Sequence, residues 1–290
     1  NVIERFETEG TMKHLKFCQL APMNIHFVQF PLEYFLDTVA ALELERIELW
    51  GGGPEVCIDT LSFFRVQQIK KMVAQRKLKI ACFTPETCFY PINLASPDQE
   101  TRSRSLRYCL RGVDIAAELE APLMQVVSGK GYFDEPNDQA WDRARESLSL
   151  LAERAQQCGV QLTLEPLSPY ESNLVNSLQA AKTMLAQIGS PCLGINVDTV
   201  PVDLTHTPLQ DYFDQLGAVI NHFHFCDRTE QAGWVPCGDG QMPLKELLEI
   251  MDRNGYGGSL GLEICGVAYY KDPAAALQRA VGRLRMYMEG

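Results

Sequence analysis

Residues 161–173 read QLTLEPLSPYESN, and this stretch decides the fold. It predicts a short buried strand that ends at Glu165, because Pro166 lacks the backbone N–H that would continue a strand ladder. A second acid, Glu171, follows in the same loop. In α/β barrels the chemistry lies at the carboxyl ends of the strands. Two acids at this position therefore indicate a functional site.

The same pattern returns at three later strand ends. Asp198 lies in LGINVDT, His224 in INHFHFCD and Glu263 in LGLEICG, each after a predicted helix. Successive strands of a parallel barrel lie side by side with their carboxyl ends on one rim, so we expect these three side chains to converge with Glu165. Carboxylates with one imidazole suit Mn²⁺, Co²⁺ or a similar ion. The four residues therefore predict a divalent-metal site.

The rest of the chain alternates predicted strands and helices. Short apolar runs predict strands at residues 15–19, 46–50, 79–83, 122–127, 161–165, 193–198, 220–226 and 259–263. Apolar residues at helical spacing predict helices at residues 32–43, 60–76, 101–119, 138–158, 177–188, 208–216, 244–254 and 273–288. This alternation over about 275 residues matches a single-domain α/β fold, the (β/α)₈ TIM barrel. A doubly wound open sheet is the alternative, but no Gly-rich phosphate turn follows the first strand.

We assign the barrel to residues 12–290 as the catalytic domain. Residues 1–11, NVIERFETEGT, precede it and are expected to be a tail or a remnant of cloning, with no function assigned.

Composition excludes several classes of function. The formal net charge of −11 argues against a nucleic-acid-binding surface, which would be basic. No apolar run approaches the roughly 20 residues that span a membrane, and no basic segment followed by an apolar core marks a signal peptide. The ten cysteines include no CxxC pair, so we expect reduced thiols and a cytoplasmic protein.

Long loops are expected on the rim that carries the four candidate ligands, and they indicate a lidded pocket. These loops are residues 84–100, 128–137 and 227–243. We expect Glu86 and Glu171 to contact substrate hydroxyls, and Trp50 to line the pocket at the end of the second strand. Tyr90 and Arg228 are further candidates for substrate contacts from the loops.

Two more polar residues lie on predicted strands. Glu48 alternates with apolar neighbours, so it is expected to be buried, and a buried acid is costly without a partner. A salt bridge or the anchoring of a loop would account for it. His222 lies two residues before His224 and therefore faces the same side of the strand, but deeper. We expect it to pack in the core or to support the site.

Seven short segments together resemble a known family. They are IELWGG at 47–52, TPET at 84–87, LEPLSPYESN at 164–173, VDT at 197–199, HFH at 222–224, PCGDG at 236–240 and LEI at 262–264. The chain resembles the sugar isomerase and epimerase branch of the xylose-isomerase-like barrels. It is most similar to ketose 3-epimerases, those of the fructoselysine type above all, and also those acting on tagatose and psicose.

The resemblance implies roles for particular residues. Glu165, Asp198, His224 and Glu263 correspond to metal ligands, and the two glutamates also to the catalytic acid/base pair. Glu171 falls on a substrate-contact position. The chain departs from the tagatose and psicose enzymes where they carry a histidine and an arginine. Pro201 and Glu230 stand at those places, and Arg228 is an approximate substitute for the arginine.

The implied activity is inversion of C3 of a ketose or a fructosamine through an enediolate. It implies one divalent ion, Mn²⁺ first, with Co²⁺, Mg²⁺, Ni²⁺ and Zn²⁺ as alternatives. The expected partners are a sugar substrate and further copies of the chain in a dimer or tetramer, with no nucleic acid and no membrane.

Four alternatives stay open at this point. An aldose–ketose isomerase of the hydroxypyruvate type and a lyase of the inosose-dehydratase type use similar residues. The endonuclease IV branch needs a three-zinc cluster with more histidines than the five present here. A sugar-binding protein without a metal is the fourth.

Overall fold

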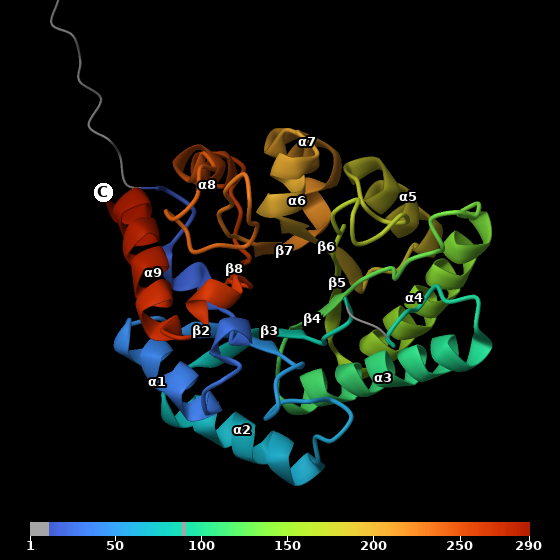
Figure 1. Cartoon of the computed structure of the whole chain (residues 1–290), viewed down its shortest axis with the longest axis horizontal. Coiled ribbons are helices and arrows are strands. Elements are labelled where there is room, and N and C mark those ends of the chain that lie inside the picture. The colour runs from blue at the N-terminus through green and yellow to red at the C-terminus, as the bar shows by residue number, and fades with distance from the viewer. Residues whose placement is uncertain (1–11, 89–90) are drawn as a thin grey trace, which may run out of the picture.

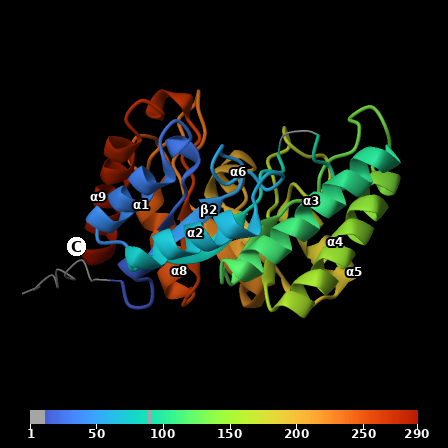
Figure 2. The same cartoon turned by 90° about the horizontal axis from the view of Figure 1, so that it is seen from below.

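The computed structural model describes residues 12–88 and 91–290. The expected tail at residues 1–11 and the candidate Tyr90 lie outside the described residues. Within them the chain forms the expected barrel of parallel strands inside a layer of helices (Figure 1). Seen from the side, long loops rise at one end of the barrel (Figure 2). The fold class predicted from the sequence is confirmed.

The strands all belong to one eight-stranded sheet across the described ranges. They are β1 (Leu20–Pro22), β2 (Arg46–Trp50), β3 (Lys79–Thr84), β4 (Leu123–Val126), β5 (Gln161–Leu164), β6 (Leu193–Asp198), β7 (Ile220–His224) and β8 (Ser259–Leu262). The helices are α1 (Leu32–Ala41), α2 (Phe63–Gln75), α3 (Gln99–Glu118), α4 (Asp138–Cys158), α5 (Leu178–Ile188), α6 (Thr199–Leu204), α7 (Leu209–Leu216), α8 (Leu244–Arg253) and α9 (Pro273–Glu289).

Local sequence signals explain several helix boundaries. The side chain of Ser62 accepts a hydrogen bond from the Arg65 N–H and so caps α2. Asp272 does the same for α9, whose first residue is Pro273, a residue with no N–H to satisfy. Helix α4 ends at Gly159, whose φ of 70° is the left-handed conformation that glycine adopts most easily.

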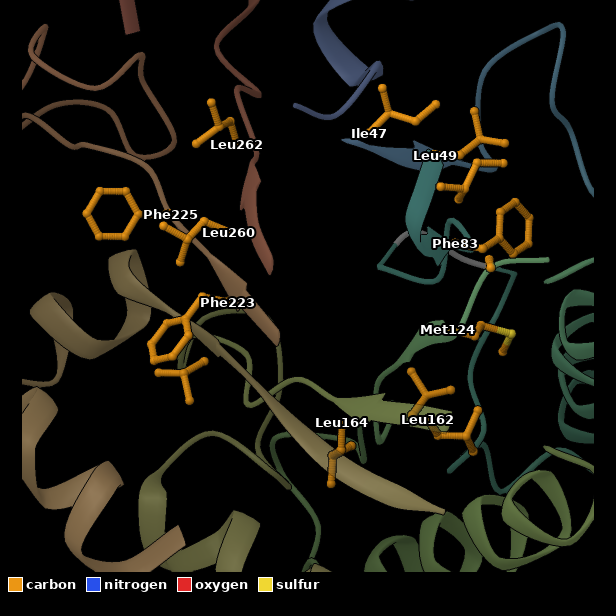
Figure 3. Packing of buried hydrophobic residues seen from close by; sticks show 14 of the residues in the cluster. Ile47, Leu49, Phe83, Met124, Leu162, Leu164, Phe223, Phe225, Leu260 and Leu262 are labelled. Atoms are coloured by element: carbon orange, nitrogen blue, oxygen red, sulfur yellow. The ribbon is translucent and has the colours of Figure 1, made fainter. Parts of the chain in front are cut away.

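The strands are two-sided, and their apolar side faces the helices. Ile47 and Leu49 on β2, and Phe223 on β7, belong to the packed cluster between strands and helices (Figure 3). The alternate residues, such as Glu48 and His222, are also buried but are polar. Because successive side chains of a strand point to opposite faces, they lie inside the barrel. The hydrophobic core is therefore the layer between the strands and the helices, whereas these inward-facing side chains make the barrel interior polar.

The barrel closes at a seam between β1 and β2. Every other neighbouring pair of strands has a ladder of at least two residue pairs, whereas this seam has one parallel bridge, between Met23 and Glu48. The side chain of Asn24 supplements it. Its Oδ1 accepts from the Trp50 N–H at 2.7 Å, and its Nδ2 donates to the Trp50 carbonyl at 3.3 Å. One amide side chain thus takes the place of a strand neighbour for Trp50.

The first predicted strand was wrong. Residues 15–19 were expected to be extended, but Phe17–Gln19 is a 3₁₀ turn and the strand follows at Leu20–Pro22. The reason is long-range: the N–H groups of residues 13–15 donate to the Asp252 carboxylate, and the Gln19 side chain bonds to the Gly258 carbonyl. These bonds fasten the segment across the amino end of the barrel before the strand begins.

Helix α6 was not predicted from the sequence. It starts directly after β6, where the Asp198 side chain accepts a hydrogen bond from the Val200 N–H.

In the described ranges, no helix combines the length and the apolar character needed to cross a membrane.

The seam generates a prediction about stability. Asn24→Ala leaves the partly buried main-chain groups of Trp50 without these partners, and we expect a loss of about 1–3 kcal/mol in the free energy of unfolding. Asn254→Ala is the control, because its amide makes three hydrogen bonds but is exposed. It should cost no more than about 0.5 kcal/mol. Denaturant midpoints of the two variants measure the difference, and equal losses would contradict a special role for Asn24.

Candidate metal centre

The four predicted ligands come together at the carboxyl end of the barrel. One donor atom from each of Glu165, Asp198, His224 and Glu263 lies within 4.8 Å of all the others. His224 Nδ1 lies 2.7 Å from Glu165 Oε1 and 3.0 Å from Glu263 Oε2. The register explains the meeting, because Asp198 pairs with His224 and His224 with Gly261 on adjacent strands.

The donor geometry fits a divalent ion. His224 Nδ1 is buried and has no hydrogen-bond partner of acceptable angle, although two carboxylate oxygens lie close to it. Donors bound to one ion at about 2.0–2.3 Å lie up to roughly 4–4.6 Å apart, so the observed spread requires little movement. Three carboxylates and one imidazole are a donor set typical of Mn²⁺ and similar ions.

Electrostatics at the cluster also favour a cation. Burial raises the pKa of Glu165, and the nearby charge of Glu263 raises it further. Burial likewise raises the pKa of Asp198, with the charges of Glu165 and Glu263 adding to the effect. Burial alone would lower the pKa of His224, but the surrounding carboxylates of Glu165, Glu48 and Glu263 raise it well above its usual value. The group holds more negative charge than it can keep without a proton or an ion.

Two of the three carboxylates are also held from outside the cluster. Gln125 on β4 donates to Glu165 Oε2, and Asn196 on β6 donates to Glu165 Oε1 at 3.2 Å. Asp198 Oδ2 accepts from the indole N–H of Trp234 at 2.8 Å. Sequence reasoning did not find these three partners. Gln125 and Asn196 occupy inward-facing strand positions, which is the one signal that could have found them.

A cavity of about 190 Å³ opens beside the cluster. Its lining includes the predicted Trp50, Glu86 and Glu171 together with Glu165, Asp198 and Glu263. No lysine, arginine or histidine is among the described residues that line it. The cavity wall therefore carries five carboxylates and no basic side chain.

The predicted substrate-contact residues are held in place by neighbours. Trp50 Nε1 donates to Glu86 Oε2 at 3.1 Å. Glu171 Oε2 accepts from the Ser168 hydroxyl at 2.6 Å and from the Ser168 N–H at 3.1 Å. Arg228 lies outside the cavity lining, and its guanidinium donates to the Asp203 carboxylate.

A larger cavity of about 590 Å³ lies at the opposite end of the barrel, among the first residues of several strands. Arg46, Lys79 and Ser259 are among the residues that line it. Among the described residues no cluster of potential metal ligands lies there. The candidate metal ligands therefore lie at the smaller cavity.

Comparison with known proteins identifies the family of the chain. The family model described as "Xylose isomerase-like TIM barrel" matches residues 36–287. The chain is 33% identical to fructoselysine 3-epimerase of Shigella flexneri over 260 residues, which is 89% of this chain and 93% of that protein. It is 26% identical to D-psicose 3-epimerase of Ruminiclostridium cellulolyticum over 181 residues, or 59% of each chain.

Solved structures give the same fold. D-psicose 3-epimerase with D-tagatose from Clostridium cellulolyticum H10 superposes with a TM-score of 0.78 at 18% identity, over 93% of this chain and 98% of that one. At this identity the likeness shows the fold alone. With the family model covering most of the chain, and a relative at 33% identity along nearly its whole length, the chain belongs to the xylose isomerase-like TIM barrel family.

Proposed function

We propose that this protein is a metal-dependent epimerase that inverts C3 of an amine-linked ketose, a fructosamine of the fructoselysine kind. It is an enzyme of the ketose 3-epimerase type, the type named for its curated relatives. The observation that carries the proposal is the meeting of Glu165 and Glu263 on one histidine, at 2.7 and 3.0 Å from its Nδ1. These two carboxylates lie at the candidate metal site and line the cavity beside it.

The two glutamates supply the acid and the base. A hydrogen next to a ketone is only weakly acidic, and a divalent ion held by Glu165, Asp198, His224 and Glu263 would supply Lewis-acid stabilisation of the charge that develops on the substrate oxygens. One glutamate removes the proton from C3, and the other returns a proton from the opposite face. Because the proton leaves one face of the enediolate and arrives at the other, the centre is inverted.

The surroundings of the two carboxylates differ. The Glu165 side chain is 6% exposed and is held by Gln125 and Asn196, whereas the Glu263 side chain is 18% exposed at the cavity. We infer that Glu165 is the more rigidly placed of the pair. An isomerase that moves its proton along one face needs a single base, so this arrangement does not favour that alternative.

The charge of the cavity selects the class of sugar. One divalent ion neutralises two of the five carboxylates in the cavity wall and leaves a negative excess. A phosphorylated ketose would be repelled there, whereas the ammonium of an amine-linked ketose would be attracted. Glu86 and Glu171 then contact substrate from the loops, and Trp50 lines the wall between them.

Three further parts of the proposal rest on less specific features. The ion is Mn²⁺, because the donor set is rich in carboxylate oxygen. The enzyme works in the cytoplasm, where its ten free cysteines would stay reduced. It assembles as a dimer or tetramer, which light scattering of the purified protein measures.

The substrate class is tested with a panel of ketoses. Metal-loaded protein is incubated in D₂O with a fructosamine, the corresponding free ketose and a ketose phosphate, and exchange at C3 is followed by NMR. We expect kcat/KM to fall in that order, by at least about fivefold at each step, since one unit of charge in such a site is worth about 1 kcal/mol or more. A ketose phosphate that reacts best would overturn the charge argument.

The acid/base pair predicts an isotopic asymmetry. Glu165→Gln and Glu263→Gln keep an oxygen donor but lose the base, so epimerisation should fall by about 10²–10⁴-fold in each. Each variant should still exchange deuterium into one epimer, the one that presents its C3 hydrogen to the remaining glutamate, and the two variants should exchange opposite epimers.

Metal content is measured in both variants, since both residues are also candidate ligands. If either variant retains its ion and interconverts the epimers at close to the wild-type rate, the two-base mechanism is wrong.

Glu171 is expected to bind substrate and not the ion. Glu171→Ala should lower kcat/KM by about 10–100-fold, the range for a hydrogen bond to a charged group. Glu171→Gln, which keeps an acceptor for the Ser168 hydroxyl, should lose less. Both variants should bind the metal like wild type in a titration, and loss of the ion from either would refute this role.

A further inference from the structure

A second polar cluster lies beneath the candidate metal centre. Glu48 on β2 is fully buried and accepts hydrogen bonds from three side chains on two other strands. Its Oε2 lies 2.8 Å from His222 Nε2, and its Oε1 lies 3.0 Å from His224 Nε2 and also accepts from the Thr84 hydroxyl. Glu48 does not line the substrate cavity and is not among the four candidate ligands.

We propose that Glu48 is a positioning residue that holds His224 in the tautomer with its proton on Nε2, so that the lone pair of Nδ1 faces the metal ion. The proposal rests on the metal centre of the proposed function but not on the identity of the sugar. His222 and Thr84 act through Glu48, since each fixes one of its oxygens.

The hydrogen-bond inventory supports this tautomer. Glu48 Oε1 receives the Thr84 hydroxyl and faces His224 Nε2, and an ionised carboxylate can only accept. The imidazole nitrogen facing it must therefore be the donor. That leaves His224 Nδ1 as the unprotonated nitrogen, and this atom is the one beside Glu165 and Glu263. In many metal sites a carboxylate accepts a hydrogen bond from the second ring nitrogen of a histidine ligand. This bond fixes the orientation of the imidazole ring and raises its basicity.

The barrel also leaves space for this carboxylate. A Cβ atom at Gly261 on β8 would lie 2.0 Å from Glu48 Oε2 and 3.1 Å from both His222 Nε2 and His224 Cδ2. Any side chain at position 261 would therefore displace Glu48 first, because that contact is by far the shortest. Gly261 on β8 and Glu48 on β2 are thus complementary in size, and Gly261 lies two residues before the candidate ligand Glu263.

A second metal site is the competing interpretation. Glu48, His222 and His224 are close enough to form a ligand set of their own. However, the contacts of 2.8 and 3.0 Å have the geometry of hydrogen bonds and satisfy both oxygens without an ion. One ion per chain is therefore expected, and the stoichiometry of metal binding tests it.

The experiment measures metal binding without any sugar. Mn²⁺ alone is titrated by calorimetry into metal-free wild type, Glu48→Gln, Glu48→Asp and Gly261→Ala. In Glu48→Gln the amide NH₂ can donate to His224 Nε2 and push the ring proton to Nδ1, so the affinity for Mn²⁺ should fall by about 10–100-fold. Glu48→Asp keeps the charge but is one methylene shorter, so it should lose less. Gly261→Ala should lose affinity because it displaces the same carboxylate.

Thr163→Val is the matched control. Thr163 is fully buried on β5, and its hydroxyl has no hydrogen-bond partner among the described residues, so the change to a side chain of similar shape removes no hydrogen bond. Its Mn²⁺ affinity should stay within about twofold of wild type, because no positioning hydrogen bond is lost.

A spectroscopic readout separates positioning from simple loss of structure. With Zn²⁺ bound, which is diamagnetic, ¹⁵N NMR of labelled histidine should show His224 of the wild type with Nε2 protonated and Nδ1 on the metal. Glu48→Gln should lose that signature, whereas Thr163→Val should keep it. Circular dichroism checks that each variant is folded, and Glu48→Asp and Gly261→Ala carry the test if Glu48→Gln is not.

Several results would overturn the proposal: two ions per wild-type chain, no binding of divalent ions, or a Glu48→Gln variant that keeps both the affinity and the His224 signature. The absence of divalent-ion binding would also overturn the metal-dependent function. A failure of the epimerase activity alone would leave these readouts intact, and the Glu48→Gln result alone would leave the epimerase proposal intact.

Discussion

Repulsion between buried like charges is the constraint on which this site depends. Glu165 and Asp198 are almost fully buried next to Glu263, around a single imidazole. Such a group is stable only with protons or with a cation among its oxygens. The neighbouring residues do not relieve the repulsion, because Gln125, Asn196 and Trp234 contribute neutral donors that orient the carboxylates. The protein thus fixes the geometry and leaves the charge for an ion to balance.

The sequence was sufficient wherever the deciding signal is local. A strand that ends in Glu165, followed by Pro166, can be read from a few residues, and the same holds for the ends of β6, β7 and β8. Once the barrel is inferred, the convergence of the four side chains follows from parallel topology alone. The site could therefore be assembled from strand ends without knowledge of any contact.

What the sequence could not show depends on partners distant along the chain. The first strand was misplaced because Asp252, more than two hundred residues away, binds the segment that precedes it. The indole of Trp234 reaches Asp198 from a loop whose path no periodicity describes. Glu48 was recognised as a buried acid in need of a partner, but its pairing with His222 and His224 joins β2 to β7, two strands that are not neighbours in the sheet and lie far apart in the sequence.

The two-sided strands also bear on how such a protein can change over evolutionary time. Residues such as Leu49, Phe83 and Phe223 pack against the helices and hold the barrel together (Figure 3). Their immediate neighbours in sequence, Glu48, Thr84 and His224, are buried on the interior side of the same strands. Residues that stabilise the fold and residues that belong to the site thus alternate along the same strands. Inward positions can be exchanged, and a new substrate acquired, while the outward packing that carries stability stays as it is.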